Sequence, residues 1–150
     1  MRDDYWLRQR MDSMWQMLFP EVERGNVVVT RFKGRWKNKF GHIKKLKNGN
    51  TEIAINSIFM NDIIPEYIID LTLAHEMVHY MHGFNSPLPK QFKHPHAGGV
   101  VNRELKKRGF GHLIVKERYW VKNEWPPIAQ KFVKQREYKP RGFNFVKRFW

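Results

Sequence analysis

The first apolar positions along the chain recur at the spacing of one face of an α-helix. They follow the i, i+4, i+7, i+8, i+11 series of an amphipathic helix and are Leu7, Met11, Met14, Trp15 and Leu18. Asp3 or Asp4 is placed to cap this helix at its start, and Pro20 is placed to end it. The pattern therefore predicts an N-terminal helix that buries one face.

The next apolar segments have the composition and the period of β-strands. Residues 27–32 are rich in β-branched side chains, and residues 51–56 place Ile53 and Ile55 on one face of a strand. Between them, residues 33–50 alternate basic side chains with glycine and aromatic side chains, which indicates a strand or hairpin with a mobile basic loop. The Asn48-Gly49-Asn50 sequence is a turn signal. We expect a small, mostly antiparallel sheet from residues 27–58.

A long helix is predicted over residues 66–82. Pro65 suits the start of this helix, and Gly83 is a natural residue to end it. Three prolines make residues 84–95 a loop, and a further helix begins near His96 or Ala97 and runs to Arg108. The expected fold class is α+β, with the sheet packed on the helix 66–82.

That long helix carries the sequence His75-Glu76-Met77-Val78-His79, an H-E-x-x-H motif. Histidines four residues apart lie one turn apart on one helix face, so both imidazoles can reach one metal ion. Neutral imidazoles suit Zn²⁺, and zinc lowers the pKa of a bound water toward about 7. Glu76 is placed beside that water to act as the general base. The motif predicts a zinc hydrolase site.

A catalytic zinc site needs a third protein ligand, and the sequence offers several candidates. His82 shares the helix face but lies about 10 Å along the axis from His75, too far for both to share one ion with His79. The remaining candidates are His96, His94 and Glu104. His96 is favoured because it starts a helix-like segment with apolar anchors, whereas His94 and Glu104 stay open as alternatives.

At these residues the chain resembles the SprT-like (Spartan-like) zinc metallopeptidases. The similar stretches are residues 51–56, Pro65, residues 71–79 and the sequence His96-Ala97-Gly98-Gly99-Val100, with a similar opening helix. The family's third histidine begins a His-Gly-x-x-Phe sequence, so the resemblance supports His96, although the glycine is shifted here. It covers about residues 5–110 and implies a zincin-like metallopeptidase domain that cleaves proteins associated with nucleic acid.

The absence of cysteine among the 150 residues excludes disulfide frameworks, cysteine zinc ribbons and thiol catalysis. Members of the SprT-like family often carry such a ribbon, so this chain resembles a minimal form, as a small bacterial or phage version would. No apolar run is long enough to span a bilayer, and the polar N-terminus does not open a signal peptide. We expect a soluble, cytoplasmic protein without membrane contact.

Basic side chains outnumber acidic ones by 28 to 14, which gives a net charge of +14. Residues 27–50 and 90–150 are basic, whereas residues 51–89 contain no basic side chain. Such flanks favour a polyanionic partner, most simply nucleic acid bound without sequence preference. The candidate contacts are Lys37, Lys39, Lys44, Lys45, Lys106, Lys107 and Arg108.

The sequence divides into a catalytic domain over residues 1–114 and a basic, aromatic extension over residues 115–150. The extension either packs on the domain or forms an arm that stacks on bases. The leading functional hypothesis is a zinc metalloendopeptidase in which Glu76 assists attack by a zinc-bound water. The rival hypothesis is a nucleic-acid-binding or virion-associated protein that keeps a zincin fold with little proteolysis. Zinc-dependent hydrolysis of a non-peptide bond is a third possibility.

Overall fold

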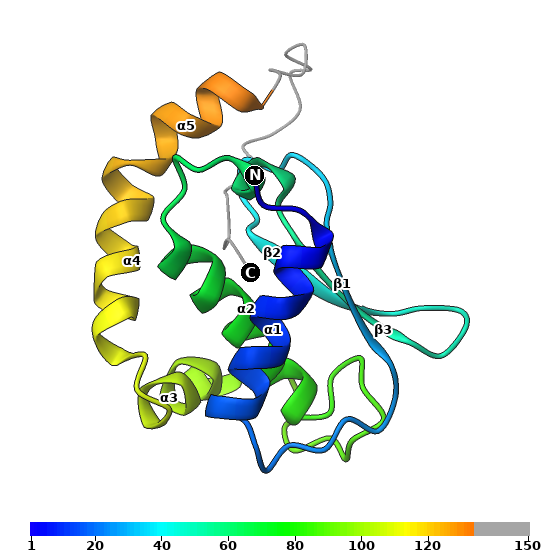
Figure 1. Ribbon diagram of the computed structural model, residues 1–150. Coiled ribbons are helices and arrows are strands. Elements are labelled where there is room, and N and C mark those ends of the chain that lie inside the picture. The colour runs from blue at the N-terminus through cyan, green and yellow to red at the C-terminus, as the bar shows by residue number, and fades with distance from the viewer. Residues whose placement is uncertain (134–150) are drawn as a thin grey trace, which may run out of the picture.

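A computed structural model describes residues 1–133 of the chain as an α+β fold with five α-helices and a three-stranded sheet (Figure 1). The helices are α1 (Asp4–Leu18), α2 (Glu66–Met81), α3 (Val100–Lys107), α4 (Gly111–Asn123) and α5 (Trp125–Phe132). The strands are β1 (Val28–Phe32), β2 (Gly41–Lys45) and β3 (Thr51–Ile55). Short 3₁₀ turns cover Ser57–Met60 and Ala97–Gly99.

The helix boundaries follow from the capping residues in the sequence. Asp3 caps α1 by accepting a hydrogen bond from the Trp6 amide at 2.8 Å, and the helix ends two residues before Pro20. Pro65 precedes the first residue of α2, and Gly83 follows its end with a φ of +85°. The predicted N-terminal and long helices are therefore confirmed to within a residue or two.

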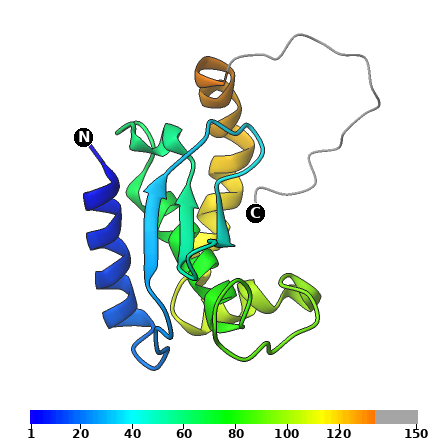
Figure 2. The same cartoon turned by 90° about the vertical axis from the view of Figure 1, so that its right-hand side faces the viewer.

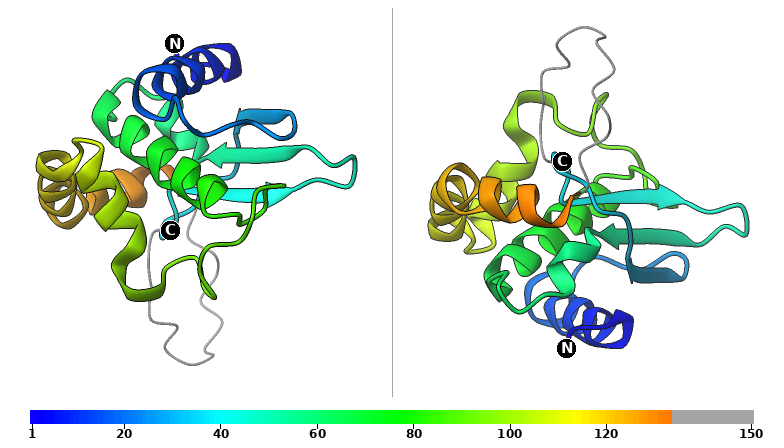
Figure 3. Two further views of the ribbon diagram at one scale, coloured as in Figure 1. Left: turned by 90° about the horizontal axis from the view of Figure 1, so that it is seen from below. Right: turned by 90° about the horizontal axis from the view of Figure 1, so that it is seen from above.

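The sheet is mixed, whereas the sequence pattern suggested a mostly antiparallel one. Its strand order is β1-β3-β2, in which β3 pairs antiparallel with β2 but parallel with β1. The β2–β3 hairpin projects away from the helices (Figure 3). The all-buried pattern of β3 reflects its central place in the sheet.

The parallel pair arises because the chain passes over the end of β3 between β1 and β2. Residues 33–40, which we call the crossing loop, leave β1 at one edge of the sheet and enter β2 at the other. The loop is bonded to the chain around the end of β3, where the Lys33 amide donates to Ile55 at 2.9 Å and the Asn56 amide donates to Phe40 at 2.8 Å. The basic loop expected to be mobile is thus tied to the central strand.

Helix α2 packs on the sheet and contacts three other helices, of which α1 also packs on β1. It contacts β2 and β3 on one side and α1, α3 and α4 on the others. Figure 2 shows α1 and the α4–α5 pair on opposite sides of the molecule, with α2 and the sheet between them. Twelve of the sixteen residues of α2 are buried, so its polar side chains have little access to solvent.

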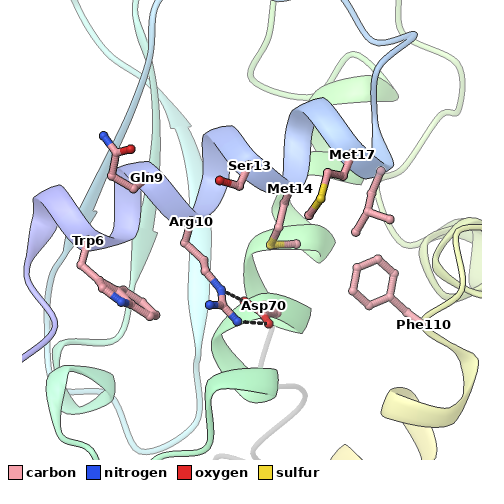
Figure 4. Close-up of a pocket in the computed structure, with 9 residues that line it drawn as sticks. Trp6, Gln9, Arg10, Ser13, Met14, Met17, Asp70 and Phe110 are labelled. Atoms are coloured by element: carbon pink, nitrogen blue, oxygen red, sulfur yellow. Dashed lines mark hydrogen bonds and ion pairs between the residues drawn. The ribbon is translucent and has the colours of Figure 1, made fainter.

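An ion pair joins α1 to α2 at the floor of a surface groove (Figure 4). The Arg10 guanidinium donates to both carboxylate oxygens of Asp70, at 2.6 and 2.7 Å. Such two-pronged pairs are among the stronger charged contacts in proteins. The rest of the groove is lined by apolar side chains of α1, by Gln9 and Ser13 of the same helix, and by Phe110.

Helices α4 and α5 pack on the domain through an aromatic cluster. Trp120 and Trp125 contact Phe40 and Phe59, with ring centroids 5.1 to 6.3 Å apart. All four side chains are buried in the main core. Residues 115–133 of the expected extension therefore belong to the part that packs on that core, and the remainder of the expected arm, residues 134–150, lies outside the described residues.

Across residues 1–133, none of the helices is both long enough and apolar enough to span a membrane.

Glu117 is a buried acid on the inner side of α4. Its side chain is 9% exposed, and its Oε2 has no hydrogen-bond partner among the described residues. Burial raises the pKa of Glu117 to about 8, partly opposed by the charge of Arg118. The folded protein therefore holds this proton more tightly than the unfolded chain does.

This pKa difference predicts a loss of stability with rising pH. The contribution of Glu117 protonation to the free energy of unfolding is fully present below about pH 4.5 and is lost as the pH rises through about 8. We expect Glu117→Gln to flatten the pH dependence of the free energy of unfolding and to stabilise the protein at pH 9 by roughly 2–4 kcal/mol. Chemical denaturation at pH 5, 7 and 9 measures this, with Glu124→Gln at the end of the same helix as control. Parallel pH curves for the parent and Glu117→Gln would contradict the prediction.

Candidate metal centre

Helix α2 places His75 and His79 on one face, one turn apart, and buries both. Their side chains are 3% and 4% exposed, and their ring centroids lie 4.7 Å apart. The helical period accounts for this arrangement, as the motif spacing predicts.

The loop after α2 turns the chain back so that a third imidazole meets the first two. Gly83 starts this return, and a Cβ at this position would lie 2.4 Å from the Pro89 carbonyl oxygen. The Gln91 amide donates a hydrogen bond to the His82 carbonyl at 2.9 Å, which holds the returning part of the loop against the end of α2. Left-handed backbone at Gly98 and Gly99 then leads the chain into α3.

The three imidazoles converge through their Nε2 atoms. His96 Nε2 lies 3.3 Å from His75 Nε2 and 3.1 Å from His79 Nε2. Ligands at 2.0–2.1 Å from a tetrahedral zinc ion stand about 3.3–3.4 Å apart. The observed spacing therefore fits three ligands of one small ion.

Hydrogen bonding between the rings does not account for this convergence. The Nε2 atom of an imidazole carries either one proton or one lone pair, so His96 Nε2 can bond to only one of its two close neighbours. A cation among the three nitrogens uses all three lone pairs at once. His75, His79 and His96 thus form a group that could hold a metal ion.

The electrostatic surroundings keep the two helix histidines neutral. Burial lowers the pKa of His75 well below its ordinary value and lowers that of His79 to about 3, and the neighbouring imidazoles add to both shifts. Neutral imidazoles have the free lone pair that a metal ligand needs. At neutral pH the site therefore requires no deprotonation of these two residues before a metal binds.

Glu76 lies between these two histidines in the sequence and is also buried, at 2% exposure. Burial raises the pKa of Glu76 to about 8, and the charge of Lys39 opposes that shift. The carboxyl is not among the three converging ligands. It is a buried carboxyl next to His75 in the sequence and is not a member of the metal group.

The other candidates for the third ligand lie apart from the cluster. His94 is exposed on the loop two residues before His96. Glu104 instead receives a hydrogen bond from Arg108 Nε at 3.0 Å, one turn along α3. His82 is buried against Phe92, with ring centroids 4.8 Å apart, and belongs to no metal group among residues 1–133.

The seven basic side chains suggested for nucleic acid are not gathered on one surface. Lys44 and Lys45 are exposed at the end of β2, whereas Lys106 and Lys107 are exposed in the last turn of α3, on another side of the molecule (Figures 1 and 3).

The other three occupy different settings. Lys37 is exposed on the crossing loop, and Lys39 is half-buried there. Arg108 is used internally, where it pairs with Glu104 and Glu21 and donates to the Leu18 carbonyl at 2.6 Å.

Asn56 anchors the crossing loop, a structural role that the sequence pattern did not single out. Its side-chain Nδ2 donates to the carbonyl oxygens of Trp36 and Lys39, at 2.7 and 3.0 Å. Trp125 Nε1 donates to the Lys37 carbonyl at 2.8 Å. The only sequence signal for Asn56 is a polar residue directly after an apolar strand, which many turns share.

The ligand geometry predicts a clear ranking of variants by zinc affinity. His96→Ala removes one of three converging nitrogens and should weaken zinc binding by more than the roughly 10–100-fold typical of residues that only support ligands. His94→Ala and Glu104→Gln should bind one zinc ion per chain like the parent protein. Competition with a chromophoric chelator measures all three affinities. Loss of zinc in either control, with retention in His96→Ala, would refute the assignment.

Comparison of the chain with protein-family models, with curated proteins and with solved structures found no match.

Proposed function

We propose that this protein is a zinc-dependent metallopeptidase of the SprT-like type. The observation that carries the proposal is the convergence of three imidazole nitrogens. Two of them come from α2, the helix that also carries the buried Glu76. The proposal also agrees with the resemblance of residues 51–56, 71–79 and 96–100 to the SprT-like family, although these stretches include the same histidines and Glu76.

The donor set favours zinc among the common metal ions. Three imidazoles with no carboxylate ligand suit Zn²⁺ better than the oxygen-seeking ions Mg²⁺ and Ca²⁺. Three protein ligands also leave a coordination position open, which is the arrangement of catalytic zinc sites. A zinc ion held there would activate a water molecule for attack and polarise the carbonyl group of a substrate.

In this mechanism Glu76 moves the proton. Its carboxylate accepts a proton from the attacking water and later delivers it to the nitrogen of the departing amine. Burial excludes bulk water from the carboxyl, so the proton passes between the reacting groups. His75, His79 and His96 would act as ligands, and burial on α2 keeps His75 and His79 in place.

The presence of Glu76 separates this proposal from the rival one of a binding protein with a residual metal site. A purely structural site would need the three histidines but no acid beside them. A glutamate kept at 2% exposure opposes folding through its desolvation, so its retention supports a catalytic role.

Replacement of Glu76 should separate catalysis from metal binding. We expect Glu76→Gln to retain one zinc ion per chain but to lose about 10²–10⁴-fold in peptide hydrolysis, the usual contribution of a general base. Hydrolysis of an unfolded protein substrate, together with the zinc content, measures both. Glu66→Gln in the first turn of the same helix is the matched control and should keep full activity. Unchanged hydrolysis by zinc-loaded Glu76→Gln would disprove the mechanism.

We further propose that the substrates are proteins associated with nucleic acid. The net charge of +14 supports attraction to a polyanion. The side chains available for phosphate contact are the exposed ones, namely Lys37, Lys44, Lys45, Lys106 and Lys107. Their scatter over the crossing loop, β2 and α3 favours contact with phosphates over reading of bases.

This second proposal predicts a salt-dependent affinity. The logarithm of the binding constant should fall linearly with the logarithm of salt concentration, by about 0.9 per phosphate contact on duplex DNA. Lys44→Ala/Lys45→Ala should reduce that slope by up to about two contacts, whereas Lys122→Ala on α4 should not. Fluorescence anisotropy with a labelled duplex between 50 and 300 mM salt tests this. A flat salt dependence would remove nucleic acid from the proposal and leave the peptidase intact.

A further inference from the structure

The sheet turns one face toward the core and the other away from it. Ile53 and Ile55 of the central strand β3 are fully buried and belong to the main hydrophobic core. Side chains alternate between the two faces of a strand, so Glu52 and Ala54 point to the opposite face. This second face, which we call the outer face, therefore carries a carboxyl group on its central strand.

Basic side chains of both edge strands share the outer face with Glu52. In the strand pairing, Arg31 of β1 and His42 of β2 lie on either side of Ala54, and Lys44 of β2 lies beside Glu52. Side chains of paired residues stand on the same face of a sheet. The outer face thus consists of Val29, Arg31, His42, Lys44, Glu52 and Ala54.

Lys33 joins this group directly after the end of β1. Its amide donates to the Ile55 carbonyl at 2.9 Å, so its backbone is bonded to the central strand. Lys33 Nζ lies 3.4 Å from Glu52 Oε1, and Arg31 Nε lies 3.3 Å from the other carboxylate oxygen, Oε2. One carboxylate therefore holds an ammonium and a guanidinium group side by side.

The group as a whole keeps an excess of positive charge. Glu52 is 2% exposed, and burial alone would raise its pKa, but contacts with Lys33, His42 and Arg31 hold that pKa below its ordinary value. Burial and the charge of Lys39 lower the pKa of His42, so its imidazole is neutral at pH 7. Two cations therefore face one carboxylate.

Both cations are also open to solvent. The side chains of Arg31 and Lys33 are 53% and 47% exposed, whereas the carboxylate between them is covered. Together a guanidinium and an ammonium group carry more N–H donors than one carboxylate can accept. The pair can therefore bind a second anion from solvent without giving up Glu52.

We propose that Arg31 and Lys33 form a phosphate clamp on the outer face that binds the backbone of duplex nucleic acid. Glu52 is the positioning residue that keeps the two cations together. The proposal rests on the nucleic-acid partner proposed above and assigns it a surface. Neither cation of the clamp is among the seven contacts suggested by the sequence.

The charge around the clamp favours a polyanion over a single small anion. Residues 27–50, which contain β1, the crossing loop, β2 and most of the turn after it, hold eight basic side chains and no acidic one. Lys44 is exposed on the outer face and continues the positive charge toward the projecting end of the β2–β3 hairpin (Figure 3). A row of cations of this kind matches the repeated charge of a phosphate backbone.

The aromatic ring beside the outer face is already packed, which favours contact with phosphates over stacking on bases. The Trp36 ring lies 5.5 Å from the His42 ring, and Lys39 Nζ lies 4.4 Å from its centroid. A Cβ at Gly34 would clash with the same ring. Binding through phosphates alone favours the duplex, because two strands present more charge per unit length than one.

The test compares Arg31→Gln/Lys33→Gln with Arg118→Gln/Lys122→Gln. The second pair removes the same charges from exposed positions on α4, across α2 from the sheet, and is the matched control (Figure 1). Fluorescence anisotropy with a labelled DNA duplex, at salt concentrations from 50 to 300 mM, gives the affinity and its salt dependence. Competition with polyglutamate of equal total charge shows whether the surface prefers an acidic polypeptide.

We expect Arg31→Gln/Lys33→Gln to reduce the slope of log affinity against log salt by about 1.8, which corresponds to two lost phosphate contacts. At 100 mM salt the duplex should bind about 10- to 100-fold more weakly. The α4 variant should match the parent protein in slope and affinity. Because the double variant leaves Glu52 buried with fewer partners, Arg31→Gln/Lys33→Gln/Glu52→Gln is the second variant and should show the same loss.

Four outcomes would overturn the inference. A parent-like slope in folded protein of both clamp variants would reject the clamp and leave the nucleic-acid proposal standing. An equal loss in the α4 variant would show a general effect of net charge and would also reject the clamp. A preference of the parent protein for polyglutamate would assign the outer face to an acidic polypeptide instead. Failure of the parent protein to bind the duplex at 50 mM salt would reject the nucleic-acid proposal together with this inference, but not the peptidase.

Discussion

Helix α2 is covered by other elements along most of its length, and the arrangement of the molecule follows from what that burial demands. Burying a polar group without a partner destabilises a protein by about 1–3 kcal/mol, and α2 carries several such groups. Arg10 of α1 meets Asp70, and the loop after the helix brings His96 to His75 and His79. Helix α1 and the loop that leads into α3 thus each meet α2 at polar side chains of that helix.

Much of this could be predicted from local sequence, because local physics dominates in those places. Helix caps and helical period depend on neighbours within four residues, which is why α1, α2 and the pairing of His75 with His79 were foreseen. The sequence favoured His96 as the third ligand, and the structure brings it to the other two. The path of the chain around His96 depends on the conformations of Gly83, Gly98 and Gly99 and on the hydrogen bonds of the loop. The amino-acid composition only suggests these conformations.

The parallel pairing of β1 with β3 and the surroundings of the basic residues could not be read from the sequence. Strand direction depends on the crossing loop, which is held by Asn56 and Trp125, residues 16 or more positions away from their loop partners. The net charge of a chain does not reveal which charged side chains pair with other groups inside the fold. Arg108 is held internally by contacts up to 90 residues distant in the chain, and Lys39 is half-buried with its ammonium over the Trp36 ring, whereas Lys44 stays in solvent.

The strand order has a consequence for the order in which the chain folds. Paired residues of β2 and β3 are 6 to 14 positions apart, whereas those of β1 and β3 are 23 apart. Closing the shorter loop loses less chain entropy, so the hairpin forms early and β1 is added to a strand that is already paired on its other side. The crossing loop can close over the end of β3 only after both strands are in place. The loop that joins the two edge strands is therefore expected to order late in folding.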